Sequence, residues 1–118
     1  MSLNINIRET PDAVILDLTG QITLGESLVN LRDAIREALG TDRKNVLLNL
    51  AGVTYIDSSG LGQLVGSFAT VANNGGQLKL LNLQKRVQDL MQVTKLLTVF
   101  EAYNSEPVAL KSFAKAAS

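Results

Sequence analysis

Two adjacent serines carry the clearest chemistry in this sequence of 118 residues. They lie in the run Asp57-Ser58-Ser59-Gly60-Leu61-Gly62, soon after the apolar segment 46–50. A helix that begins here leaves backbone N–H groups unpaired at its positive dipole end, so its start attracts an anion. Asp57 or Ser58 can cap those donors, and a phosphoryl group on serine would add about two negative charges there. The run predicts either a helix cap or a site that phosphorylation switches.

Two glycines in the same run indicate a constraint other than helix stability. Glycine inside a helix costs about 1 kcal/mol relative to alanine, yet Gly60 and Gly62 both fall in the first turn. Small residues there would allow a partner's backbone to approach closely. The simpler alternative is that the run only begins a helix, since Asp, Ser and Gly are ordinary cap and turn residues. The residues alone leave both interpretations open, and they do not separate Ser58 from Ser59.

The composition excludes most catalytic chemistry. The chain has no Cys and no His, so it lacks a thiolate nucleophile, the usual general base and the commonest metal ligand. A serine hydrolase would depend on a lysine base such as Lys79 or Lys85, without a Gly-x-Ser-x-Gly elbow. Eleven basic and eleven acidic residues leave no net charge to recruit nucleic acid or an anionic membrane. We expect a non-enzymatic protein with no cofactor and no metal, whose partner binding is local.

Length and hydropathy favour one compact domain over residues 1–118. Hydrophobic residues make up 46% of the chain, without repeats or linkers, which is enough to bury a core. No apolar segment has the length of a membrane span and no signal-peptide pattern opens the chain, so we expect a cytoplasmic protein. The basic residues Lys79, Lys85, Arg86 and Lys95 form at most a modest patch, which we interpret as a solvated face.

The periodicity of apolar residues predicts alternating strands and helices. Strand patterns cover residues 3–7, 13–19, 45–50, 77–83 and 98–103, with Gly20 ending the second strand. Helical patterns cover residues 26–39, a helix from Ser58 that ends at 73–76, a short helix around 87–91, and a last helix from Glu106. Phe100 and Tyr103 are expected to close the core. The inner face of the second helix is expected to contain Leu61, Leu64, Val65, Phe68, Val71 and Ala72.

These elements and motifs resemble the anti-sigma factor antagonists of the STAS domain family. The resemblance rests on the strand 46–50, on Val53, on the run from Ile56 to Gly62, and on Gly75-Gly76 before the next strand. It covers roughly residues 3–113. It implies an α/β fold of the STAS type in the order β-β-α-β-α-β-α-β-α, with roughly four to five mixed strands flanked by about four helices.

The resemblance also implies a function. In such proteins the first serine after the aspartate is phosphorylated by an anti-sigma factor that is also a serine kinase, which selects Ser58 over Ser59. The unmodified form binds the kinase and frees a sigma factor, the phosphorylated form is released, and a serine phosphatase restores it. The partner-binding residues are then Thr23, Asp57, Ser58, Ser59, Gly60 and Gly62, and we expect the free protein to be a monomer.

The segment 20–26 departs from the family pattern. Many relatives carry an aspartate shortly after the glycine that ends the second strand, and Thr23 stands near that position. Thr23 can form a hydrogen bond but cannot supply charge, so it either contacts a partner or belongs to a loop that closes the first helix. The alternative function that the family implies is a scaffold without a kinase cycle, as a regulatory subunit of a transporter or signalling assembly.

Overall fold

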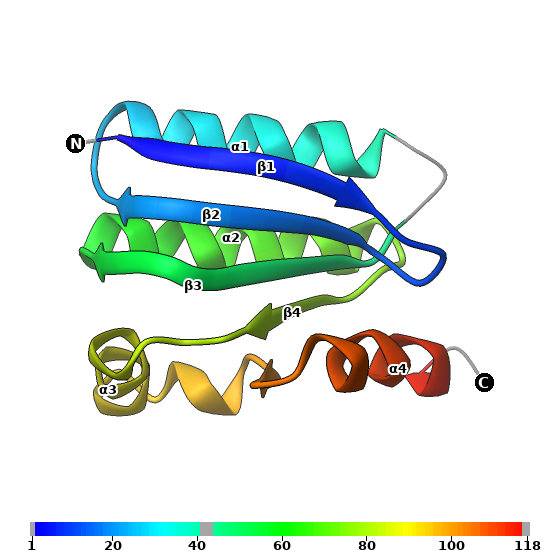
Figure 1. Ribbon diagram of the computed structural model, residues 1–118. Coiled ribbons are helices and arrows are strands. Elements are labelled where there is room, and N and C mark those ends of the chain that lie inside the picture. The colour runs from blue at the N-terminus through cyan, green and yellow to red at the C-terminus, as the bar shows by residue number, and fades with distance from the viewer. Residues whose placement is uncertain (1, 41–43, 117–118) are drawn as a thin grey trace.

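The computed structural model describes residues 2–40 and 44–116 and confirms the predicted order of strands and helices (Figure 1). One short 3-10 helix, η1, is added before the last strand. The elements are β1 (Leu3–Glu9), β2 (Val14–Ile22), α1 (Glu26–Leu39), β3 (Val46–Ile56), α2 (Ser58–Asn73), β4 (Leu78–Leu81), α3 (Lys85–Val93), η1 (Leu96–Thr98), β5 (Ala102–Tyr103) and α4 (Glu106–Ala116).

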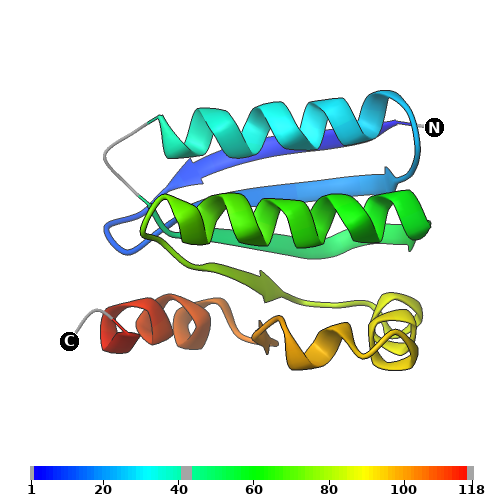
Figure 2. The ribbon, with the colours of Figure 1, turned by 180° about the vertical axis from the view of Figure 1, so that it is seen from behind.

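The strands form one mixed sheet in the order β1-β2-β3-β4-β5. β1 is antiparallel to β2, and the other neighbours are parallel. α1 and α2 lie behind the sheet in Figure 1 and in front of it in Figure 2, so they cover the same face. Because β2 and β3 are parallel and each leads into one of these helices, the loop before α1 lies beside the start of α2.

The core has two layers, one on each face of the sheet. Successive strand residues point to opposite faces, so Val14 packs with α1 and α2, whereas Ile15 packs with α4. Both side chains are at most 1% exposed. Phe100 and Tyr103 close the two layers as predicted, and Phe100 packs edge-on against Phe68 with ring centroids 5.5 Å apart.

Gly20 does not end β2, contrary to the prediction. It lies within the strand at φ +122°, beside shifts in the register with β3. A Cβ at this position would lie 2.3 Å from the carbonyl oxygen of Ser2, so the backbone conformation and the close approach both require glycine. Glycine is common both in β-bulges and at the ends of strands, so the residue type alone does not show which of the two is present. Only the pairing of β2 with its neighbours identifies the bulge.

The other strands differ from the prediction at their ends. β3 extends to Ile56 rather than ending at Leu50, because β2 pairs with it as far as its last residue. β4 is limited to four residues. β5 has only two residues, because η1 occupies the preceding segment after Lys95, whose φ is 64°. Strand ends therefore follow the available partners rather than local propensity.

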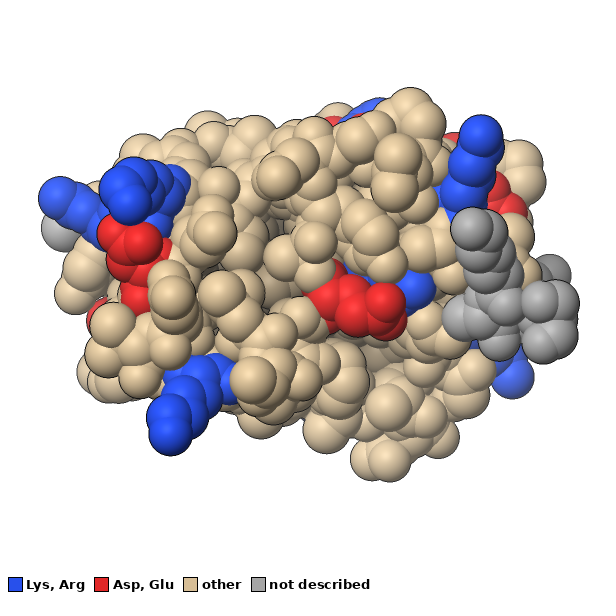
Figure 3. All heavy atoms as spheres, turned by 90° about the horizontal axis from the view of Figure 1, so that it is seen from below, with Lys and Arg blue, Asp and Glu red and all other residues tan. Residues whose placement is uncertain are grey.

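Lys79 does not belong to a solvated basic face, contrary to the prediction. It is 3% exposed, and its Nζ donates to Ser112 Oγ of α4 at 2.8 Å and lies 3.5 Å from a carboxylate oxygen of Glu101. Nζ lies 4.8 Å from the ring centroid of Phe113 and 5.7 Å from that of Tyr103. On this side of the molecule, Figure 3 shows basic surface only as separate spots on a mainly uncharged face. Lys79 thus holds α4 against the sheet.

Lys79→Ala should lower the free energy of unfolding by about 2 kcal/mol, because it empties buried space beneath α4 and removes the bond to Ser112. Lys79→Met keeps most of the side-chain volume without the charge and should cost less than half as much. Urea unfolding followed by circular dichroism measures both changes. A loss below about 0.5 kcal/mol in Lys79→Ala, as at a solvated position, would contradict this role.

Candidate functional site

Asp57 joins two parts of the chain where β3 leads into α2. It is the N-cap of α2, with φ −90° and ψ −179°, and its Oδ1 accepts the N–H of Gly60 at 2.7 Å. Its Oδ2 accepts the N–H of Leu24 at 2.9 Å, from the loop between β2 and α1. The sequence predicts the first bond but not the second, because Leu24 is 33 positions away.

These bonds make Asp57 a fixed negative charge. The N–H of Leu24 and then that of Gly60 stabilise the carboxylate, and they lower the pKa of Asp57 below its ordinary value of 3.8. A carboxylate with a lowered pKa whose two oxygens both bind backbone donors is a poor general base. Asp57 therefore holds the two backbone segments in place and supplies a negative charge, but it does not activate a neighbouring hydroxyl.

The two serines differ in accessibility. Ser58 is the first residue of α2 and is exposed, whereas Ser59 is half-buried. In the part of the chain that the structure describes, neither hydroxyl has a hydrogen-bond partner. A modifying enzyme would reach Ser58 more readily, and this distinction was not available from the residues alone.

Gly60 and Gly62 meet different requirements. A Cβ at Gly60 would lie 2.1 Å from the carbonyl oxygen of Ile22 and 2.8 Å from Cγ2 of Ile56, so only glycine fits where α2 begins against the sheet. Gly60 is buried, and its close approach is to Ile22 rather than to a partner. Gly62 is exposed, and nothing lies within 4 Å of an added Cβ. The surface at Gly62 is therefore free for contact.

Thr23 is half-buried in the loop between β2 and α1. Its N–H donates to Ser27 Oγ at 2.9 Å, and that hydroxyl donates to the Thr23 carbonyl oxygen at 2.6 Å. Ser27 thereby closes the start of α1, because the N-cap residue, Gly25, has no side chain that could cap the helix. The segment is therefore a loop that closes the first helix, and a contact between Thr23 and a partner stays a prediction.

Sequence reasoning missed two residues that hold this loop, Ser27 in the first turn of α1 and Leu24 in the loop itself. A serine in the first turn of a helix is a known local signal for a side-chain to backbone bond, so Ser27 could have been identified. Leu24 takes part through its backbone N–H, for which the side-chain type gives no signal. The loop is fastened to α1 at Thr23 and to Asp57 at Leu24.

The outer face of α2 is uncharged, since the helix contains no acidic or basic residue. Leu64 is buried as predicted, but Val65 is 38% exposed and Ala72 is exposed, contrary to the prediction. Each helical residue is rotated by about 100° from the last, so Val65 turns toward solvent when Leu64 faces the core. A neutral surface with Gly62 and Val65 therefore continues along the helix from its start.

The lysines considered as bases for a serine nucleophile have other partners. Lys79 binds Ser112 beneath α4, and Nζ of Lys85 lies 3.6 Å from a carboxylate oxygen of Asp89. The site therefore presents an exposed serine hydroxyl at a helix start, without a lysine base beside it among the lysines considered. Within residues 2–40 and 44–116, no group of three or more His, Cys, Asp or Glu side chains could hold a metal ion. None of the helices in these ranges combines the length and apolar character of a membrane span.

Asp57→Asn should destabilise the fold at neutral pH, because an amide nitrogen cannot accept and one backbone donor loses its partner. A carboxylate whose pKa is lowered by folding stabilises the fold above its unfolded pKa, near 3.8, and this stability is lost as pH falls through the folded pKa. The difference in melting temperature between wild type and Asp57→Asn should therefore shrink below about pH 4.

Asp33→Asn, on an exposed position of α1, is the matched control for this substitution. Thermal unfolding between pH 7 and pH 2.5 measures the three proteins. A difference between wild type and Asp57→Asn that stays constant over this range would show that Asp57 is not the fixed anion described above.

Comparison with known proteins confirms the resemblance seen in the sequence. Residues 4–109 match the family model of the STAS domain. The anti-sigma-B factor antagonist of Bacillus subtilis (strain 168) is 31% identical over 101 residues, which cover 86% of this chain and 91% of that protein.

Solved structures share the fold. An anti-sigma factor antagonist from Mycobacterium paratuberculosis superposes with a TM-score of 0.80 and 16% identity, over 96% of this chain and 95% of that chain. The Bacillus cell fate determinant SpoIIAA in its phosphorylated form gives a TM-score of 0.70 and 20% identity, over 92% of this chain and 98% of that chain. Since the family model spans residues 4–109 and the mixed sheet with its flanking helices agrees with it, the chain belongs to the STAS domain family.

Proposed function

We propose that this protein is an anti-sigma factor antagonist whose unphosphorylated form binds an anti-sigma factor serine kinase and frees a sigma factor. Phosphorylation of Ser58 switches this binding off, and a serine phosphatase restores it. The observation that carries the proposal is the exposed hydroxyl of Ser58 at the start of α2, without a partner among the described residues. The name of the Bacillus subtilis relative and the phosphorylated form of SpoIIAA support it.

The charges around Ser58 explain how a phosphate would act. Asp57 is held as an anion directly before Ser58, and the outer face of α2 is neutral. A phosphate brings about two negative charges and would make this surface strongly anionic. A partner surface shaped for a neutral hydroxyl would then meet charge repulsion and a desolvation cost, so the complex would dissociate.

The fold should survive the modification. The side chain of Ser58 lies in solvent, so a phosphate there displaces no packed group. The start of α2 presents the positive end of its dipole, which favours a negative group. The switch therefore acts on the affinity for the partner rather than on the fold.

The contact surface of the proposed switch surrounds Ser58. It comprises Thr23, Asp57, Ser58, Ser59 and Gly62, and Gly60 contributes by holding the start of α2 against the sheet. We further propose that the protein is a cytoplasmic regulator rather than an enzyme, binds neither nucleic acid nor membrane, and is a monomer when free.

Incubation with ATP and the anti-sigma factor kinases encoded in the same genome should add one phosphate to this protein. Intact-mass and phosphopeptide analysis should find it on wild type and Ser59→Ala, and not on Ser58→Ala, because Ser58 is the exposed hydroxyl. A phosphate that is still added to Ser58→Ala would show that Ser58 is not the modified serine. Stable binding of a kinase with no phosphate on any variant would instead support the scaffold function.

Ser58→Asp should bind the modifying kinase at least about tenfold more weakly than Ser58→Ala, a difference of about 1.4 kcal/mol. The aspartate adds a charge beside Asp57 at the centre of the contact, whereas alanine leaves the surface neutral. Isothermal titration calorimetry at low and high salt measures both variants, and the difference should narrow as salt screens the charge. Equal affinities at low salt would rule out the switch.

A further inference from the structure

An apolar groove of about 340 Å³ lies at the carboxyl end of β3, against α3. We call it the Tyr55 groove. Its apolar lining comes from Tyr55 and Ile56 of β3 and from Val87, Leu90 and Val93 of α3. A hydrophobic recess therefore lies at the end of β3, the strand that leads into Asp57.

The groove has a packed floor and exposed walls. Ile56 is 2% exposed and Val87 is 1% exposed, so the floor belongs to the core. Tyr55 is 43% exposed and Val93 is 81% exposed, so the walls present apolar surface to solvent. Exposed apolar surface that is gathered around a recess is typical of a site that a partner covers.

The rim of the groove indicates the chemistry of the occupant. Arg86 and Asp89 lie at the groove and carry opposite charges, so together they add no net charge. The remaining lining is apolar or aromatic. A large aliphatic or aromatic side chain fits this environment, whereas an isolated charge would be desolvated without compensation.

The groove lies close to Ser58, because β3, which supplies Tyr55 and Ile56, leads directly into Asp57 and α2. Only two residues, Ile56 and Asp57, lie between Tyr55 and Ser58 along the chain, which limits the distance between the Cα atoms of Tyr55 and Ser58 to about 11 Å. A stable protein interface covers about 800 Å² on each partner, so a protein that covers Ser58 also reaches this groove. Large hydrophobic side chains are also exposed at Leu24, whose N–H binds Asp57, and at Val65 of α2.

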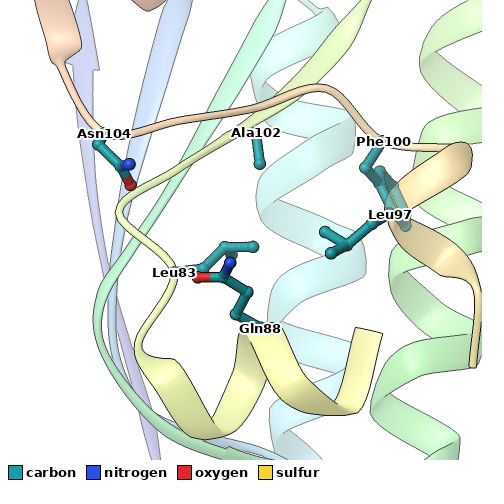
Figure 4. A pocket seen from close by; sticks show the side chains of 6 residues that line it. All are labelled: Leu83, Gln88, Leu97, Phe100, Ala102 and Asn104. Atoms are coloured by element: carbon teal, nitrogen blue, oxygen red, sulfur yellow. The ribbon is translucent and has the colours of Figure 1, made fainter. Parts of the chain in front are cut away.

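A second hollow, of about 280 Å³, lies on the other side of α3 toward β5, and Figure 4 shows its lining. None of its lining residues belongs to β3 or α2, so it is not continuous with Ser58. The residues are Leu83, Gln88, Leu97, Phe100, Ala102 and Asn104.

We propose that the Tyr55 groove receives a large apolar side chain of the same kinase that covers Ser58, an inference that rests on the function proposed above. The groove supplies affinity that does not depend on phosphorylation, because none of its lining residues is modified. Ser58 supplies the switch. Recognition and switching are thereby assigned to neighbouring but separate parts of one interface.

Val93→Glu tests the groove, because Val93 is the most exposed wall residue and its replacement should not disturb the core. Val108→Glu on α4, at a position that is 54% exposed, is the matched control with the same change in charge. Tyr55→Ala is a second test that introduces no charge. Circular dichroism and thermal unfolding establish that each variant is folded before binding is measured.

Val93→Glu and Tyr55→Ala should each weaken binding of the kinase that modifies Ser58 by about tenfold or more, while Val108→Glu binds like wild type. Phosphorylation of Ser58 should show a raised KM for the two groove variants and an unchanged kcat, because the groove does not contact the hydroxyl. Affinities equal to that of Val108→Glu would overturn the role of the groove. So would a change in the oligomeric state of the free protein on Val93→Glu, which would make a second copy of this chain the occupant.

The Ser58 variants separate the two possible failures. If Ser58→Asp weakens binding but the groove variants do not, the groove proposal is wrong and the switch stands. If Ser58→Asp and Ser58→Ala bind equally, the switch itself is wrong, whatever the groove variants show.

Discussion

The carboxylate of Asp57 is the interaction on which the whole site depends. One oxygen closes the first turn of α2 at Gly60, and the other fixes the loop before α1 at Leu24. Two segments that approach each other at the same end of the sheet thereby share one anchor. The surface around Ser58 has a defined shape because helix start and loop are held by the same side chain. A phosphate placed on Ser58 meets a rigid charged neighbour rather than a flexible one.

The sheet supplies the close contact that this anchor needs. β2 and β3 pair as far as Ile22 and Ile56, and the N–H of Asp57 donates to the Ile22 carbonyl oxygen at 3.2 Å. α2 can begin against that carbonyl only because Gly60 lacks a Cβ. The helix start is therefore determined by backbone packing, and its anion-binding character is a consequence of where the sheet ends.

Charged side chains hold the opposite part of the fold together. Arg8 binds Asp17 at 2.6 Å and Glu106 at 2.7 Å, which ties β1 and β2 to the start of α4. These contacts lower the pKa of Asp17, chiefly through the bond from Arg8. Lys79 of β4 also holds α4, through its bond to Ser112. Arg8 and Lys79 thus place their charges around α4, whereas α2 itself contains no charged residue and follows the single carboxylate of Asp57. A phosphate on Ser58 would therefore add its charge to that of Asp57 on an otherwise neutral part of the proposed contact surface.

The sequence was enough to predict the order of strands and helices, the cap at Asp57 and the pair of candidate serines. Periodicity and capping depend on residues that are neighbours along the chain. Strand ends, the glycine bulge at Gly20 and the burial of Lys79 could not be predicted in this way, because each depends on a partner far along the chain. The same reason separates the members of the site. Sequence alone determined that Asp57 and Ser58 stand at a helix start; only the tertiary structure decided that Leu24 completes the anchor and that Gly60 is internal, because parallel pairing of β2 and β3 is what brings those backbones together.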